Sequence, residues 1–177
     1  MPTTYAIPDG RTVMAASLYA GAGTTQSVTN TVNGISFKPD FVWLKNRTNV
    51  NSNYLFDAVR GVGAYLSSDA TAAESTNAQT LTAFNSNGFT LGTVGGGING
   101  SGSNFVGWQW QAGQGTTSSN TSGSITSTVS VNATAGFSVV TYTGTGSAGA
   151  TVGHGLGVAP AMIDRKSTRL NSSDGYI

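Results

Sequence analysis

The sequence predicts an all-β protein, an antiparallel β-sandwich that continues into the start of a second β unit. Helical periodicity is almost absent, whereas short apolar runs bounded by Gly, Asn and Ser recur along the chain. Seven runs have the length of strands: Val13–Tyr19, Phe41–Asn46, Thr80–Phe84, Phe89–Gly92, Asn104–Gln111, Ile125–Val131 and Phe137–Tyr142. Short strands joined by Gly-rich turns favour two stacked sheets, as in jelly-roll or lectin-like folds, with an up-and-down barrel as the alternative.

Two local patterns refine this prediction. Asn85-Ser-Asn-Gly88 lies between two apolar runs, and Asn and Gly accept the positive φ angles of tight turns, so we expect a hairpin there. In the run that ends at Trp110, alternation places Val106, Trp108 and Trp110 on one side of the strand, which we expect to face the core. Residues 68–77 fit a single helical turn or a loop equally well.

The composition excludes several classes of function. Gly, Thr, Ser and Asn account for 85 of the 177 residues, whereas charged residues make up 8% and the net charge is +1. Because no basic block occurs, the chain lacks the electrostatic footprint of a nucleic-acid-binding protein. It also lacks an apolar run of about 18 residues that could span a bilayer. The absence of Cys and the single His exclude disulfides, thiol catalysis and multi-His metal clusters.

The charged residues are unevenly distributed. Residues 75–163, which are 89 in number, contain no Asp, Glu, Lys or Arg. Acid–base catalysis needs a titratable group near the reacting atoms, and in this stretch only His154 could provide one. The sequence therefore predicts no catalytic residue, no metal and no cofactor, and it leaves the residues that would bind a ligand undefined.

One strand–turn–strand pattern occurs twice. Ser17-Leu-Tyr-Ala-Gly-Ala-Gly23 precedes Gly34-Ile-Ser-Phe-Lys-Pro39, and Val140-Thr-Tyr-Thr-Gly-Thr-Gly146 precedes Gly155-Leu-Gly-Val-Ala-Pro160. Both halves recur in the same order, with a length difference of two residues between them. We expect each copy to form a strand, a Gly-rich turn and a second strand entered through Pro, so that each copy opens a structural unit.

The repeat divides the chain into parts. We expect an N-terminal segment at 1–11, a β-sandwich unit at 12–112, a flexible Gly/Ser/Thr linker at 113–123 and the opening strands of a second, truncated unit at 124–163. The pattern breaks after residue 163, and residues 164–173 resemble the in-frame translation of a sequencing-library adapter. Residues 164–177 are therefore expected to be a non-native tail.

The most specific strings are Phe37–Arg47, Leu55–Gly61, Tyr65–Ser68, Leu81–Gly92, Phe105–Gly113, Gly136–Gly146 and Val152–Pro160. They resemble a domain of unknown function found in tailed-bacteriophage virion proteins, which are tail-associated or other particle-surface components. The resemblance implies a concanavalin-A-like β-sandwich, a structural or adhesive role, and no established catalytic residues. The chain departs from this pattern after residue 163.

Glycine-rich segments and one histidine are candidate sites for which a structural role is the better interpretation. Residues 144–149 and 95–100 fit G-x-G-x-x-G, but the residues after the first cannot form the helix that a dinucleotide site needs, so we expect turn glycines. His154 corresponds to Asn33 in the first copy of the repeat, which favours a turn-forming residue over a ligand contact.

Acidic residues offer a second group of candidates. We expect Asp57 and Arg60 to form a local ion pair, and Asp40 to shape a turn beside Pro39. Calcium binding through Asp40 or Asp69 is the alternative, although no clustered acidic loop is present. A glycan depolymerase would need two carboxylates about 5 to 9 Å apart, and these could come only from Asp9, Asp40, Asp57, Asp69 and Glu74.

The sequence thus predicts a surface structural module of a phage virion, tail-associated, made in the cytoplasm of the bacterial host, and not an enzyme. Its expected partners are other virion subunits, including copies of itself, and host-surface glycans, but neither nucleic acid nor a membrane. The alternative is a lectin-like carbohydrate-binding module. Trp43, Trp108 and Trp110 could stack on sugars if they were exposed beside Asp or Asn, but their positions on apolar strands favour burial.

Overall fold

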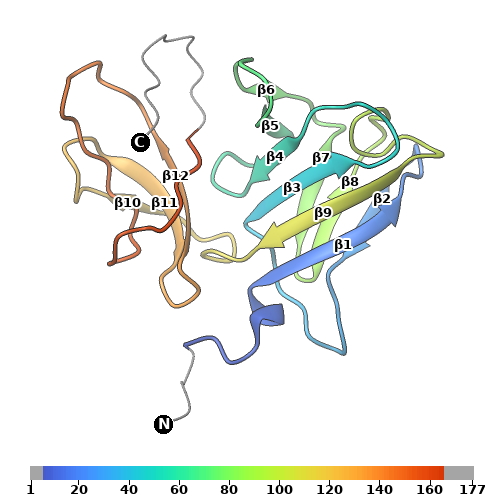
Figure 1. The fold of residues 1–177 in the computed structure, drawn as a ribbon, viewed down its shortest axis with the longest axis horizontal. Coiled ribbons are helices and arrows are strands. Elements are labelled where there is room, and N and C mark those ends of the chain that lie inside the picture. Colours follow the sequence, from blue (N-terminus) through green and yellow to red (C-terminus); the bar gives the residue numbers. More distant parts are fainter. Residues whose placement is uncertain (1–5, 166–177) are drawn as a thin grey trace.

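The computed structural model describes residues 6–165, which form an all-β protein without an α-helix (Figure 1). The expected antiparallel β-sandwich is confirmed. A 3₁₀ turn, η1 (Gly10–Thr12), precedes twelve strands: β1 (Met14–Ala20), β2 (Gln26–Thr29), β3 (Phe41–Asn46), β4 (Tyr54–Asp57), β5 (Ala64–Ser67), β6 (Ser75–Thr76), β7 (Leu81–Asn85), β8 (Gly88–Leu91), β9 (Asn104–Trp110), β10 (Ser118–Asn120), β11 (Ser127–Asn132) and β12 (Phe137–Tyr142).

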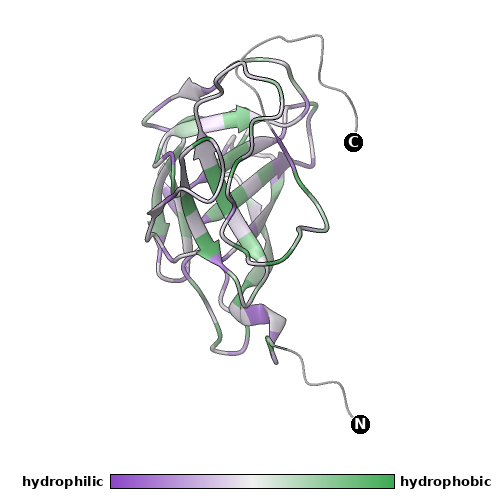
Figure 2. Ribbon diagram, turned by 90° about the vertical axis from the view of Figure 1, so that its left-hand side faces the viewer, coloured by the Kyte–Doolittle hydropathy of each residue, from purple (hydrophilic) through white to green (hydrophobic). Residues whose placement is uncertain are grey.

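Two sheets form the sandwich. The larger has the order β1-β9-β3-β4-β5-β6, the smaller has the order β2-β8-β7, and neighbouring strands are antiparallel. Alternating side chains bury apolar residues between the sheets, and Figure 2 shows apolar and polar residues alternating along the strands. The buried cluster consists of Val28, Val42, Leu44, Phe56, Leu81, Phe89, Leu91 and Ile98.

The inner face of β9 is the opposite of the predicted one. Phe105, Gly107 and Gln109 face the core, whereas Trp108 and Trp110 lie half-buried on the outer side of the large sheet. A Cβ atom at Gly107 would lie 3.0 Å from Leu44 Cδ2 and 3.1 Å from a ring carbon of Phe89, so a larger residue would require these side chains to shift by a few tenths of an ångström. The expectation that Trp108 and Trp110 point into the core was therefore wrong, whereas Val106, on the same side of β9, is buried with 8% of its surface exposed.

A buried polar side chain makes this orientation possible. Gln109 is fully buried, and its amide donates to Ser17 Oγ at 3.0 Å and accepts from Asn30 Nδ2 at 3.3 Å. Burying an amide is tolerated when its hydrogen bonds are satisfied. Nearby, the buried Tyr19 hydroxyl donates to the Ile98 carbonyl at 2.8 Å, and burial raises its pKa above the usual value.

The predicted hairpin at residues 85–88 is confirmed. Strands β7 and β8 pair antiparallel, with Asn85 opposite Gly88, so that Ser86 and Asn87 form the turn. Gly88 has a φ of +144°, and a Cβ atom there would lie 2.1 Å from the Val28 carbonyl oxygen of the neighbouring strand. Residues 68–77, predicted as a helical turn or a loop, form a loop that ends in the short strand β6.

A third sheet, with the order β10-β11-β12, lies beside the sandwich (Figure 1). All of its residues belong to the uncharged stretch 75–163. The segment 113–123, expected to be a flexible linker, contains β10, which pairs with β11 from Ser118 opposite Val129 to Asn120 opposite Ser127. This part of the predicted linker is therefore ordered as a sheet edge.

The two copies of the repeat have the same path at first and then differ. Strand β12 corresponds to β1. In both copies the chain that follows this strand returns across the inner face of the sheet to which the strand belongs, where a serine of the strand donates to a carbonyl of the returning chain. The first copy continues into β3, where Val42 is fully buried. In the second copy the residue at that position, Ile163, is 75% exposed. Residues 1–5 of the N-terminal segment and residues 166–177 of the predicted tail lie outside the described part.

Candidate functional site

The outer side of the large sheet carries four aromatic residues, Phe41, Trp43, Trp108 and Trp110, which we name the aromatic face. Strands β3 and β9 place Phe41 opposite Trp110 and Trp43 opposite Trp108. The ring centroids are 5.5 Å apart in the first pair and 6.0 Å apart in the second. All four residues are half-buried, so each ring keeps part of its surface accessible. The aromatic face exists because β9 turns Gly107 and Gln109 inward.

One end of the aromatic face is covered by the third sheet. Phe137, the first residue of β12, stacks on Trp110 with ring centroids 5.9 Å apart and an interplanar angle of 13°. It also lies 5.9 Å from Phe41. The Trp43–Trp108 end is not part of this stack. On the same side of the sheet, exposed residues of the neighbouring strand β1 lie next to this end, including Leu18, which is 68% exposed.

Polar groups border Trp43 at the open end. The Trp43 indole donates from Nε1 to Asn53 Oδ1 at 3.0 Å, and the Asn53 backbone N–H donates to Asp69 Oδ1 at 3.0 Å. Lys45, two residues along β3 on the same side, donates from Nζ to the Asn51 carbonyl. Although desolvation raises it, the pKa of Asp69 is lowered overall by the hydrogen bond from Asn53 and by the charge of Lys45. The open end thus combines indole rings with amide and charged groups.

Asp57, Arg60 and Glu74 form an ion-pair network at the end of β4. Asp57 accepts hydrogen bonds from the Arg60 side chain and from the backbone N–H groups of Val59 and Arg60. Arg60 Nη1 lies 3.1 Å from Glu74 Oε2, and Nη2 donates to the Leu55 carbonyl at 3.0 Å. The guanidinium therefore links the turn after β4 to the loop before β6, as a local structural pair would.

Asp40 is fully buried at the start of β3. Its carboxylate accepts backbone hydrogen bonds from Ala112 at 2.7 Å, Gln114 at 2.7 Å and Gly115 at 2.5 Å. Three converging N–H donors hold a carboxylate and oppose a cation, so this geometry does not fit the calcium alternative. Asp40 instead fixes the turn that leads from β9 toward the third sheet.

The remaining acidic residue of the predicted set, Asp9, pairs with Arg11 at 2.7 Å on the surface. All five carboxylates therefore have a local partner in a turn, a cap or an ion pair. Between residues 6 and 165, no group of three or more His, Cys, Asp or Glu side chains could hold a metal ion. The same part of the chain contains no helix with the length and hydropathy to cross a membrane.

His154 and the glycine-rich segments lie in loops. His154 Nδ1 accepts from the Leu156 backbone N–H at 3.2 Å, and its carbonyl accepts from Ser138 Oγ at 2.6 Å. Its counterpart Asn33 forms a different turn, in which Asn33 and Gly34 have φ angles of 51° and 78°. In the segment 95–100, Asn99 is fully buried and accepts from the Ala22 backbone at 3.0 Å.

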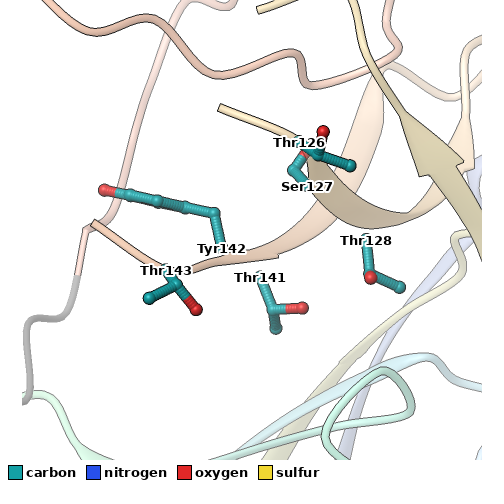
Figure 3. A pocket seen from close by; sticks show the side chains of 6 residues that line it. All are labelled: Thr126, Ser127, Thr128, Thr141, Tyr142 and Thr143. Carbon is teal, nitrogen blue, oxygen red and sulfur yellow. The ribbon is translucent and has the colours of Figure 1, made fainter. Parts of the chain in front are cut away.

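A hydroxyl-lined pocket lies on the third sheet, where the start of β11 meets the end of β12 (Figure 3). Its volume is about 260 Å³, and it is lined by Thr126, Ser127, Thr128, Thr141, Tyr142 and Thr143. Thr128 and Thr141 lie opposite each other in the pairing of the two strands. No sequence motif marked this pocket, because its six residues come from two segments that meet only when the strands pair.

Comparison with known proteins identifies a family. Neither the curated proteins nor the solved structures contain a match to this chain. One family model, described as Domain of unknown function (DUF7483), matches residues 10–174. The match includes both predicted units and extends beyond residue 163, where the sequence pattern breaks. Because it covers most of the sequence, the chain belongs to the DUF7483 family.

Proposed function

We propose that this protein is a non-catalytic structural module of a phage virion surface, tail-associated, that contributes to subunit assembly or to contact with the host. The observation that carries the proposal is the local structural engagement of the five carboxylates that precede residue 164, Asp9, Asp40, Asp57, Asp69 and Glu74. A glycan hydrolase needs a carboxyl pair that is free to exchange protons with its substrate. Partners of such a module are other virion subunits, including copies of itself.

The resemblance of the two repeat copies to virion-protein strings supports the particle-surface part of this proposal. The composition supports it as well, because hydroxyl and amide groups form neutral hydrogen bonds with neighbouring subunits or with glycans. The direct test is immunogold electron microscopy of phage particles whose genome encodes this chain, with antibodies against the purified chain. Gold on particle tails is the expected result, and gold confined to cell debris would exclude the proposal.

A second function, carbohydrate binding, is favoured by the open end of the aromatic face. Trp43 and Trp108 lie on one sheet face, beside Asn53, Asp69 and Lys45. Indole rings stack on the apolar faces of sugars, and neighbouring amides and carboxylates bind the sugar hydroxyls. Host-surface glycans would be the natural ligands of such a platform on a virion.

Removal of one indole ring should abolish retention of the chain on a glycan array. We expect Trp43→Ala to weaken binding to the best array ligand at least about tenfold, because a stacked indole contributes roughly 1.5 kcal/mol or more. Isothermal titration with that ligand measures the change. Tyr142→Ala, which removes an exposed ring from the third sheet, is the control and should bind normally. If the wild-type chain bound no glycan on the array at high protein concentration, this second function would be excluded.

A further inference from the structure

Strand β1 has one hydrogen-bonding edge that no strand covers within the described residues, because β1 is the end strand of the large sheet (Figure 1). The Gln111 backbone N–H donates to the Val13 carbonyl at 2.8 Å, and the Gly21 N–H donates to the Ser103 carbonyl at 2.9 Å. The backbone N–H and C=O groups of the odd-numbered residues of β1 therefore point toward β9. The backbone groups of the even-numbered residues, Met14, Ala16 and Leu18, point to the open edge.

A groove runs beside this edge. It has a volume of about 430 Å³, and one wall is formed by Arg11 and residues 14–18. The opposite wall is formed by residues 29–32, which are the last residue of β2 and the three residues after it. Ser17 Oγ donates to the Thr29 carbonyl at 2.9 Å and connects the two walls at the inner side. The site thus offers a row of unpaired backbone groups and a space beside them for side chains.

The second copy of the repeat shows this position filled. When Tyr142 is aligned with Tyr19, Phe137, Val139 and Thr141 correspond to Met14, Ala16 and Leu18. Strands β11 and β12 form a hairpin closed by Asn132 opposite Phe137, and the described loop 133–136 has no backbone-to-backbone hydrogen bond within it. If the closing pair were not hydrogen-bonded, a backbone hydrogen bond would have to lie within the loop. The backbone groups of Phe137, and of every second residue after it in β12, therefore bond to β11. Strand β11 thus occupies the edge of β12 that corresponds to the open edge of β1.

The groove wall has its counterpart in the second copy as well. Residues 150–153 correspond to 29–32, and they contact the chain that enters β11. The Ile125 backbone N–H donates to the Thr151 carbonyl at 3.0 Å, and Ile125 also forms a bridge with Val152. Ser127 Oγ donates to the Gly153 carbonyl at 2.8 Å. One segment, 125–132, thus covers both the edge strand and the wall.

We propose that the open edge of β1 and its groove form an acceptor site for an extended segment of a partner chain with the pattern of residues 125–131. In that pattern, Ile125, Ser127 and Val129 are buried and alternate with the exposed Thr126 and Thr128. Ser130, whose hydroxyl accepts from the Gly113 N–H, is buried on the other side of β11. The bound segment would run antiparallel to β1 and extend the large sheet by one strand, as in β-strand addition. Alternate side chains would fill the groove against residues 29–32. This inference does not depend on the proposed function.

The test uses a labelled peptide with the sequence of residues 123–133 and the full-length chain. Fluorescence anisotropy should show saturable binding. Ala16→Pro removes a donor at the open edge without removing a hydrogen bond to β9, and it should weaken binding about tenfold or more. Ala16→Ser retains the backbone N–H and should bind like the wild type. The peptide with Val129→Asp, which puts a charge into the groove, should not bind.

Hydrogen exchange on the wild-type chain provides a second readout that does not rely on a variant. The peptide should slow the exchange of the Ala16 and Leu18 amides, which point to the open edge, while the Ala15 amide, already bonded to β9, should change little. No binding at millimolar peptide, or equal binding by Ala16→Pro, would overturn the proposal. A third outcome would also overturn it. If the peptide did not bind, but analytical ultracentrifugation showed a concentration-dependent dimer that Ala16→Pro abolished, the open edge would pair with the edge of a second copy instead.

Discussion

Replacement of Asp40 by asparagine should lower the free energy of unfolding by about 3 kcal/mol. The carboxylate is fully buried and accepts three backbone hydrogen bonds from Ala112, Gln114 and Gly115. Asparagine has the same shape, but its NH₂ group would face N–H donors. At least one buried donor would then lose its acceptor, and hydrogen bonds to a charged group contribute about 1.5 to 3 kcal/mol each.

Urea denaturation followed by intrinsic tryptophan fluorescence measures this effect, because Trp110 lies next to the junction that Asp40 holds. Asp9→Asn is the matched control. Its carboxylate is on the surface and pairs with Arg11, so the midpoint of unfolding should not change measurably. An Asp40→Asn midpoint equal to that of the control would show that the three hydrogen bonds contribute nothing to stability.

Gly88→Ala should destabilise the sandwich by about 3 to 5 kcal/mol. Two costs combine at this position, since its φ of +144° is unfavourable for alanine and the new methyl group would lie 2.1 Å from the Val28 carbonyl oxygen. Backbone strain of this kind costs about 1 to 3 kcal/mol, and forced displacement of a packed strand costs a similar amount. Strand β2 would have to move away from β8.

Gly102→Ala separates the two costs. Gly102 also has a positive φ, +78°, but no atom lies within 4 Å of the position that its Cβ would occupy. We expect it to lose about 1 kcal/mol from the backbone alone. Thermal unfolding of the two variants side by side gives the difference. If both lost the same amount, the contact between Gly88 and the Val28 carbonyl would not restrict this position.

Much of the sandwich could be predicted because its strands alternate in a simple way. The range of β3 agrees with the prediction, and the hairpin of β7 and β8 followed from Asn and Gly at residues 85–88. The inner face of β9 could not be predicted, because the partners of Gln109, Ser17 and Asn30, lie 92 and 79 residues away in the sequence. An isolated strand with two Trp residues predicts the Trp side as the core.

The aromatic face was missed for the same reason. Its three Trp residues were identified as candidates from the sequence, but their exposure depends on which side of β9 faces the smaller sheet. The stack of Phe137 on Trp110 has no sequence signal, because the two residues meet only across the junction. Residues 118–120 have the composition of a linker, and only pairing with β11 makes them a strand.

The neutrality of the third sheet has a consequence for how it can associate. Because β10, β11 and β12 contain no ionised side chain, this sheet produces almost no electric field. When another molecule binds to this sheet, no charge–charge attraction steers it, and there is no such attraction for dissolved ions to screen. Their strength should be the same in fresh water and in brine, unlike that of contacts built on ion pairs.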